Sequence, residues 1–89
     1  MKAIVSAIGK DQVGILALIA SECANAKANI LDVSQTIIDG MFTMTMMINV
    51  DAMNQSLADF SEHMDVLGQE KGLKIRVMHQ DVFDSMHKI

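Results

Sequence analysis

The chain has 89 residues, which is enough for one domain with a single hydrophobic core and too few for a second. Its net charge is −4 at pH 7 and no basic stripe interrupts that balance, so composition argues against a nucleic-acid surface. Although 51% of the residues are apolar, no run approaches the roughly 18 that span a bilayer. We therefore expect neither a nucleic-acid nor a membrane partner.

The N-terminus does not have the pattern of a signal peptide, because small and branched residues alternate behind a single Lys2. The one cysteine, Cys23, rules out an internal disulfide and fits a reducing compartment. We expect a cytoplasmic protein. The high apolar content of so small a chain also favours burial of some surface against another subunit.

The first half of the chain predicts a strand, a helix and a hairpin. Residues 3–8 are a short apolar run that ends at Gly9, and apolar residues then recur at helical spacing over 13–27. Asp11 is placed to cap this helix, and Asn29 to take a left-handed conformation after it. Leu18 falls outside the apolar stripe and is a candidate partner contact.

The hairpin is predicted by two alternating runs, 30–39 and 41–50, joined by Asp39-Gly40. In the first run Leu31, Val33 and Ile37 share one face, and the alternation slips at Ile37-Ile38, which favours a bulge there. In the second run period two holds throughout. One face consists of Phe42, Met44, Met46, Ile48 and Val50.

The second half predicts a helix, an edge strand and a helical tail. Ser56 and Asp59 resemble a capping box, and Gly72 is a suitable helix stop. Residues 73–80 then alternate, with Lys and Arg on the outer face, as is typical of an edge strand. Asp81 is placed to cap a tail helix in which Val82, Phe83, Met86 and Ile89 recur at helical spacing.

The order βαββαβ predicts an α+β, ferredoxin-like fold: a four-stranded antiparallel sheet with two helices on one face, followed by a short C-terminal helix. Right-handed crossovers place the first and third strands in the middle. No linker, repeat or low-complexity segment divides the chain, so we expect a single domain over 1–89.

The turn over residues 9–16 (GKDQVGIL) is the candidate ligand-binding corner. The first N–H groups of a helix can bind an anion, and Gly14 has no Cβ to keep a ligand or a backbone at a distance. A strand-to-helix connection with a purely structural role explains the same residues and, on spacing alone, is favoured.

These residues resemble the ACT domain, a small regulatory module of many amino-acid metabolic enzymes. The resemblance rests on 9–16 and on 28–32 (ANILD). The segments 33–36 and 42–44 and the tail 82–89 are similar to the small stand-alone bacterial and archaeal ACT proteins, so the likeness covers nearly the whole chain. Val13 stands where many members have proline, and Ala28 where many have glycine.

The resemblance implies a regulatory homodimer that binds an amino acid or a similar small molecule at the subunit interface, with a tetramer left open. It places the first strand-to-helix turn of one subunit opposite the start of the second strand of the other. Carried over to this chain, the ligand-binding residues are Lys10, Asp11, Gln12, Val13, Gly14 and Ile15, with Asn29, Ile30, Leu31 and Asp32 opposite.

No catalytic constellation, cofactor motif or metal site is predicted, and we expect a protein that is not an enzyme. His79 and His87 could approach each other, but a structural or solvated role is favoured over a two-histidine metal site. Met44 and Met46 share a strand face that Met47 does not, so core packing explains these methionines better than copper binding. Cys23 is interpreted as a packed thiol.

Two functions remain open. In the first, the protein is a sensor whose dimer binds an amino acid, the carboxylate at the Gly14 turn and the ammonium at Asn29 or Asp32. In the second, it is a protein–protein interaction or oligomerisation module without a small ligand, and the turn is structural. The first is the working preference.

Overall fold

A computed structural model describes residues 1–87 of the chain. Its seven elements follow the predicted order. They are β1 (Lys2–Lys10), α1 (Ile15–Asn25), β2 (Asn29–Ile38), β3 (Met41–Asn49), α2 (Leu57–Lys71), β4 (Leu73–His79) and α3 (Gln80–Met86). Among the residues described, no helix is both long enough and apolar enough to cross a membrane.

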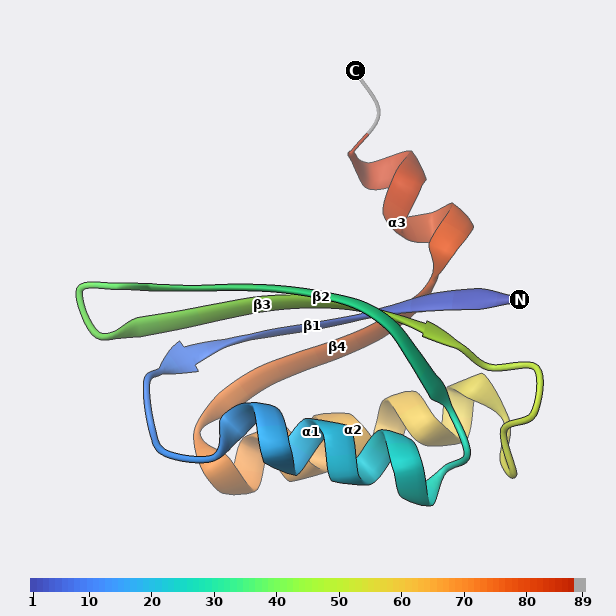
Figure 1. The fold of residues 1–89 in the computed structure, drawn as a ribbon, viewed down its shortest axis with the longest axis horizontal. Coiled ribbons are helices and arrows are strands. Elements are labelled where there is room, and N and C mark those ends of the chain that lie inside the picture. The colour runs from blue at the N-terminus through green and yellow to red at the C-terminus, as the bar shows by residue number, and fades with distance from the viewer. Residues whose placement is uncertain (88–89) are drawn as a thin grey trace.

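The strands form one antiparallel sheet in the order β2-β3-β1-β4, so β1 and β3 are central, as predicted. Helices α1 and α2 cover one face of this sheet (Figure 1). Helix α3 rises from the opposite face at the end where the N-terminus lies (Figure 1). The ferredoxin-like prediction is confirmed. The face away from α1 and α2 is called the open face below.

The core lies between the sheet and the two covering helices. All five residues of the predicted inner face of β3 are buried, and they meet fully buried Ile19 and Cys23 of α1 and Phe60 and Met64 of α2. The thiol of Cys23 lies 3.9 Å from the sulfur of Met46. Methionine and cysteine thus fill space that large rings fill in other small domains.

The β2–β3 hairpin turns as predicted, with Asp39 at φ 52° and Gly40 at φ 76°, as a primed two-residue turn requires. The prediction of a bulge at Ile37-Ile38 is wrong. The irregularity lies between Ile30 and Asp32, which pair with the consecutive residues Ile48 and Met47. Leu31 is the extra residue. It therefore does not share a face with Val33 and Ile37 as the alternation predicted.

The predicted caps of α2 are confirmed at both ends. The residues predicted to start and end α1, and to start α3, do not have those roles. Ser56 Oγ accepts a hydrogen bond from the Asp59 N–H at 3.0 Å, and Gly72 ends α2 in the left-handed region. After α1 it is Lys27, at φ 61°, that is left-handed, while Asn29 already begins β2. At α3 the capping acceptor is His79 Nδ1, which receives the Asp81 N–H at 3.0 Å. The predicted position of Ile89 lies outside the described residues.

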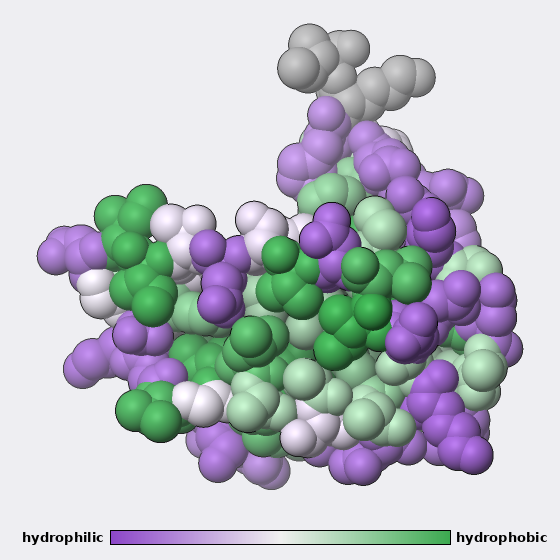
Figure 2. Space-filling model, in the orientation of Figure 1, coloured by the Kyte–Doolittle hydropathy of each residue, from purple (hydrophilic) through white to green (hydrophobic). Residues whose placement is uncertain are grey.

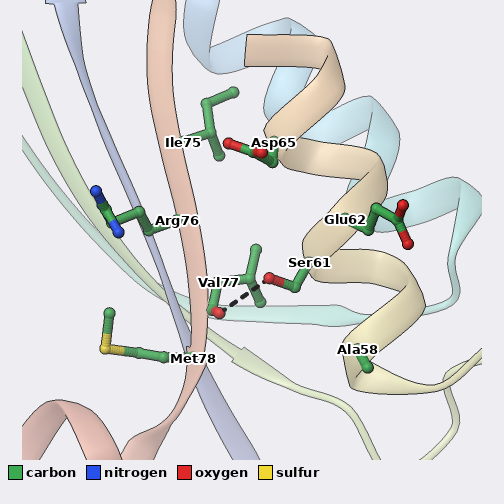
Figure 3. A pocket seen from close by; sticks show the side chains of 8 residues that line it. All are labelled: Ala58, Ser61, Glu62, Asp65, Ile75, Arg76, Val77 and Met78. Carbon is green, nitrogen blue, oxygen red and sulfur yellow. Dashed lines mark hydrogen bonds between the residues drawn. The ribbon is translucent and has the colours of Figure 1, made fainter. Parts of the chain in front are cut away.

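The outer edge of β4 is covered by α2. A Cβ at Gly68 would lie 2.6 Å from the Leu73 carbonyl oxygen, so the backbones of helix and strand touch at this point. Further along the strand, the Ser61 hydroxyl donates to the Val77 carbonyl oxygen (Figure 3). The hydrogen bond from Ser61 occupies a backbone carbonyl that an added strand would otherwise use, and the close approach at Gly68 leaves no room for such a strand there.

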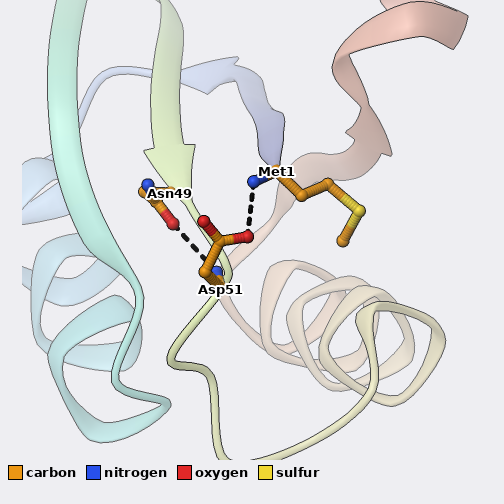
Figure 4. A network of polar contacts seen from close by, with 3 residues as sticks. All are labelled: Met1, Asn49 and Asp51. Carbon is orange, nitrogen blue, oxygen red and sulfur yellow. Dashed lines mark hydrogen bonds and ion pairs between the residues drawn. The ribbon is translucent and has the colours of Figure 1, made fainter.

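The N-terminus is tied to the chain after β3. The Met1 ammonium pairs with the Asp51 carboxylate, whose own backbone N–H donates to Asn49 Oδ1 at 2.8 Å (Figure 4). Hydrogen bonding and charge attraction from the ammonium lower the pKa of Asp51. Because a lowered pKa favours the folded state only where the carboxylate is ionised, this contribution to stability fades as the pH falls through that pKa.

The close contact at Gly68 predicts that Gly68→Ala separates α2 from β4. We expect a loss of about 1–3 kcal/mol of unfolding free energy, because backbone atoms cannot yield as a flexible side chain can. Thermal unfolding should show it as a lower midpoint. Glu70→Ala, at an exposed position of the same helix, is the control and should leave the midpoint unchanged. An unchanged midpoint for Gly68→Ala would contradict the contact.

Candidate functional site

The turn predicted to bind a ligand, residues 9–16, has a different helix start from the one that its sequence predicted. Gly9 and Lys10 belong to β1, and α1 begins only at Ile15. Gly14 is the N-cap residue, in the left-handed region at φ 86°, and no side chain caps the helix. The prediction that Asp11 caps α1 is wrong, because the left-handed Gly14 directs the chain so that the Asp11 backbone N–H meets the Gly40 carbonyl at 2.8 Å instead.

An uncapped N-terminus leaves the first backbone N–H groups of α1 available. No acidic residue lies in the first turn of the helix to compete for them. The helix has 11 residues, and its aligned peptide dipoles add a partial positive charge at this end. The corner can therefore bind an anion such as a carboxylate.

A hollow of about 190 Å³ opens beside this helix terminus. The amide of Gln12 forms its rim by donating to the Lys71 carbonyl at 2.9 Å, which fastens the turn to the end of α2. Val13 is fully exposed. The hollow is lined by Gln12, Val13, Gly14, Ile15, Leu18, Lys71 and Leu73.

Three of these lining residues were not predicted as site residues. Lys71 and Leu73 reach the turn only because α2 ends, and β4 starts, beside it. Leu18 could be noticed from the sequence, since it lies outside the apolar stripe of α1 and was predicted to contact a partner. In the structure it lines the hollow of its own chain. The lining is polar and apolar in about equal parts: Ile15, Leu18 and Leu73 contribute apolar side chains, and polar groups come from the turn and from Lys71.

The other half of the predicted site lies far from the corner. Asn29, Ile30, Leu31 and Asp32 begin β2, at the opposite end of α1 from Gly14 (Figure 1). Eleven residues of helix separate the two groups by roughly 16 Å. Asp32 Oδ1 accepts the Val33 N–H at 2.9 Å. The structure therefore brings residues 10–15 together, and residues 29–32 together, but not the two groups within one chain.

Strand β2 is the exposed edge of the sheet. Unlike β4 it has no helix over its backbone, and none of its ten residues is fully buried although half are apolar. The exposed side chains include Leu31, Ile37 at 58% and Ile38 at 69%. Figure 2 shows hydrophobic side chains gathered on the face along which β2 and α1 run.

A larger hollow, of about 530 Å³, lies between α2 and β4. Asp65 and Ser61 point toward the strand, Glu62 points away, and Arg76 lies beyond the strand on the open face (Figure 3). The Ser61 hydroxyl is already bound to Val77. Since its charged groups do not converge on one point, this shallow groove is a weaker candidate than the smaller hollow at Gly14.

The histidines do not form a metal site in the part of the chain that the structure describes. His79 and His87 flank α3 at its two ends, roughly 12 Å apart along the helix. His79 accepts the Asp81 N–H, and His87 stacks on Phe83 with ring centroids 4.1 Å apart. His63 contacts Glu22 between α2 and α1.

Comparison with known proteins matches residues 2–78 to the ACT domain family. The chain therefore belongs to the ACT domain family. It is 44% identical over 86 residues to a UPF0237 protein of Methanosarcina acetivorans, covering 97% of this chain and 94% of that protein. A UPF0237 protein of Listeria innocua is 38% identical over the full length of both chains.

Among solved structures, an ACT domain protein from Streptococcus pneumoniae superposes with a TM-score of 0.81. It is 33% identical, and the match covers 94% of each chain. The likeness to stand-alone ACT proteins is thus confirmed. ACT domains are commonly regulatory small-molecule-binding modules rather than catalytic ones.

The Cys23 thiol is predicted to be inert in the folded protein. Burial, reinforced by the charge of Glu22, raises its pKa to about 11, so very little thiolate exists at pH 8. We expect a disulfide reagent to label it at pH 8 only when denaturant unfolds the chain. The control is Cys23→Ala with Ala24→Cys, which moves the thiol to an exposed position and should label at once. Rapid labelling of the folded native chain would contradict the packed-thiol interpretation.

Proposed function

We propose that the protein is an amino-acid sensor that acts as a homodimer in the cytoplasm, without catalytic activity, and passes ligand binding on to another protein. The observation that carries the proposal is the uncapped N-terminus of α1, which opens beside a hollow of about 190 Å³. The membership of the chain in a commonly regulatory family supports it. The arguments below take the dimer first, then the ligand.

The dimer follows from the separation of the two half-sites. A twofold axis normal to the sheet at the middle of β2 pairs this strand antiparallel with its copy. The start of one β2 then lies beside the end of the other, at the same end as the partner's Gly14 corner (Figure 1). Residues 10–15 of one subunit thereby approach residues 29–32 of the other.

The properties of the two edges favour β2 as the pairing edge. Its exposed apolar side chains would be buried by a second copy, and its outer backbone groups would gain partners. The edge of β4 is covered by α2 through Gly68 and Ser61. An isologous contact of this kind closes at two copies along the sheet.

The polar ends of an amino acid match the two half-sites. Its carboxylate would accept the free N–H groups of α1 at Gly14, and its ammonium would meet Asp32 or the amide of Asn29 from the partner. The side chain would enter the hollow beside Ile15, Leu18 and Leu73. The volume of about 190 Å³ and the contact with these three apolar side chains favour a small apolar side chain over a charged one.

A thermal unfolding screen tests the sensor proposal. The purified protein is heated with each amino acid at millimolar concentration. A ligand at a hundred times its dissociation constant adds roughly 2.7 kcal/mol, a shift of several degrees for a domain of this size. We expect a shift with one or more apolar amino acids and none with lysine or glutamate.

The thermal shift of single-residue variants, measured in the same screen, tests which residues contact the ligand. Asn29→Ala and Asp32→Asn should abolish the shift by removing the partner's contacts to the ammonium, and Asp11→Ala tests the side chain nearest the turn. Glu70→Ala, on the exposed side of α2, is the control and should keep the full shift. A flat panel with every amino acid would reject the sensor and leave an interaction module whose partner is a protein.

The dimer has its own test in the exposed side chains of β2. Ile37→Lys and Leu31→Lys place charge on the free edge, where they oppose pairing without disturbing the core. Sedimentation velocity should show a smaller assembly for both variants. Val66→Lys is the matched control, because Val66 is similarly exposed but lies on α2. Equal assembly sizes for the variants and the native chain would reject pairing through β2.

A further inference from the structure

Lys74 and Arg76 lie on the open face of β4, two residues apart and therefore roughly 7 Å from each other along the strand. Both residues are exposed, and Figure 3 shows Arg76 on the side of the strand away from α2. On sequence alone, such charges are typical of an edge strand that must avoid pairing. The structure removes that explanation, because α2 already covers the outer edge of β4 at Gly68 and Ser61.

The two cations have no acidic partner within residues 1–87, where the ion pairs involve other residues. This is unexpected in a chain with 11 acidic residues and only seven lysines and arginines. Two like charges on one face of a strand repel each other, and an anion bound between them would relieve that repulsion. Lys74 and Arg76 therefore form a candidate anion site.

Hydroxyl groups extend from these cations across the rest of the sheet. Ser34, Thr45 and Ser6 are register partners on β2, β3 and β1, and Arg76 is the register partner of Ser6 on β4. The next row along the strands also begins with two hydroxyls and ends in a cation. It consists of Thr36, Thr43, Ile8 and Lys74.

The hydroxyls of the two rows line a shallow hollow of about 260 Å³. Neighbouring strands lie about 4.8 Å apart, so the row from Ser6 to Ser34 is roughly 10 Å long. The Thr43 hydroxyl donates to the Thr36 carbonyl at 3.4 Å and keeps its own lone pairs for another donor. Because a hydroxyl both donates and accepts, this hollow suits a small ligand that itself carries hydroxyl groups.

The aromatic residues of the chain lie elsewhere. Phe42 and Phe60 are buried in the core, and Phe83 stacks on His87 in the C-terminal part of the chain. The sequence has no tryptophan or tyrosine. Proteins that bind nucleobases commonly stack them on such rings, so the open face favours a polyol over a nucleotide.

We propose that the middle of the open face binds the phosphate ester of a small polyol, such as a sugar phosphate. Arg76 binds two phosphate oxygens through its planar guanidinium, and Lys74 adds a second positive charge. The hydroxyl of Ser6, the register partner of Arg76, donates to the same phosphate. The hydroxyls of the ligand exchange hydrogen bonds with Thr45 and Thr43 over the hollow.

This polyol-phosphate site consists of Ser6, Thr43, Thr45, Lys74 and Arg76. It lies on the face of the sheet opposite to α1 and α2, whereas the corner at Gly14 belongs to the helical side (Figure 1). The site is therefore separate from the proposed amino-acid site, and the two can be tested independently.

An NMR titration of the native chain tests the site. Its amide resonances are followed while glucose 6-phosphate or glycerol 3-phosphate is added at millimolar concentration. We expect saturable shifts at Ser6, Thr45 and Arg76 with at least one of the two esters. Free glucose and inorganic phosphate each supply only one part of the contacts, so each should bind roughly tenfold more weakly. Added KCl should weaken binding of the ester.

Variants identify the residues that bind the ester. Arg76→Gln and Lys74→Gln each remove one charge and should weaken its binding about fivefold or more. Thr45→Val keeps the shape of the side chain without its hydroxyl and should weaken binding about threefold or more. Lys27→Gln is the matched control, because it removes an exposed lysine that lies outside the open face. It should leave the affinity unchanged, and the amide spectrum of each variant verifies its fold.

Three results would overturn the polyol-phosphate site. The first is the absence of saturable shifts with both esters. The second is equal affinity for inorganic phosphate and the esters, which would mean an unspecific anion contact. The third is a set of shifts confined to Gly14 and Ile15, which would assign the phosphate to the helix terminus. Failure of the amino-acid proposal is recognised separately, by a flat amino-acid panel in the thermal screen.

Discussion

The packing of α2 against the outer edge of β4 decides which surfaces of this domain remain free. Gly68 lets helix and strand backbones touch, and Ser61 binds a carbonyl further along the strand. With this edge covered and one face of the sheet buried, most of the exposed apolar groups lie along β2 and at the two ends of the open face, while Val13 and Val66 lie elsewhere. Every proposal about assembly and ligand binding depends on that asymmetry.

The fold could be predicted wherever a local pattern has one physical solution. The unbroken alternation of β3, the Asp39-Gly40 turn and the Ser56 cap each gave the observed structure. The errors lie where two residues compete for one role. Gly14 replaced Asp11 at the start of α1 because a left-handed residue reorients the turn, and Lys27 adopted the conformation expected of Asn29. The bulge at Leu31 left no signal, because it depends on how β2 and β3 pair.

The candidate site could be predicted only in its local parts. The turn was evident from its glycine and from the helix that follows it. Its walls come from Lys71 and Leu73, nearly 60 residues later in the chain, and no local pattern links these residues to Gly14. The distance between the corner and the start of β2 is likewise a property of the assembled sheet. The assignment of residues 10–15 and 29–32 to one ligand site stays a prediction.

The cover over β4 also bears on how far this protein can grow as an assembly. A sheet with two bare edges can add neighbours at both and extend without limit, as a fibril does. A sheet with one bare edge accepts a single neighbour and is then complete. If β2 pairs with a second copy as proposed, loosening of α2 from β4 would convert that self-limiting dimer into an open-ended assembly. Under the same proposal, the close packing at Gly68 would limit growth of the assembly as well as hold α2 on β4.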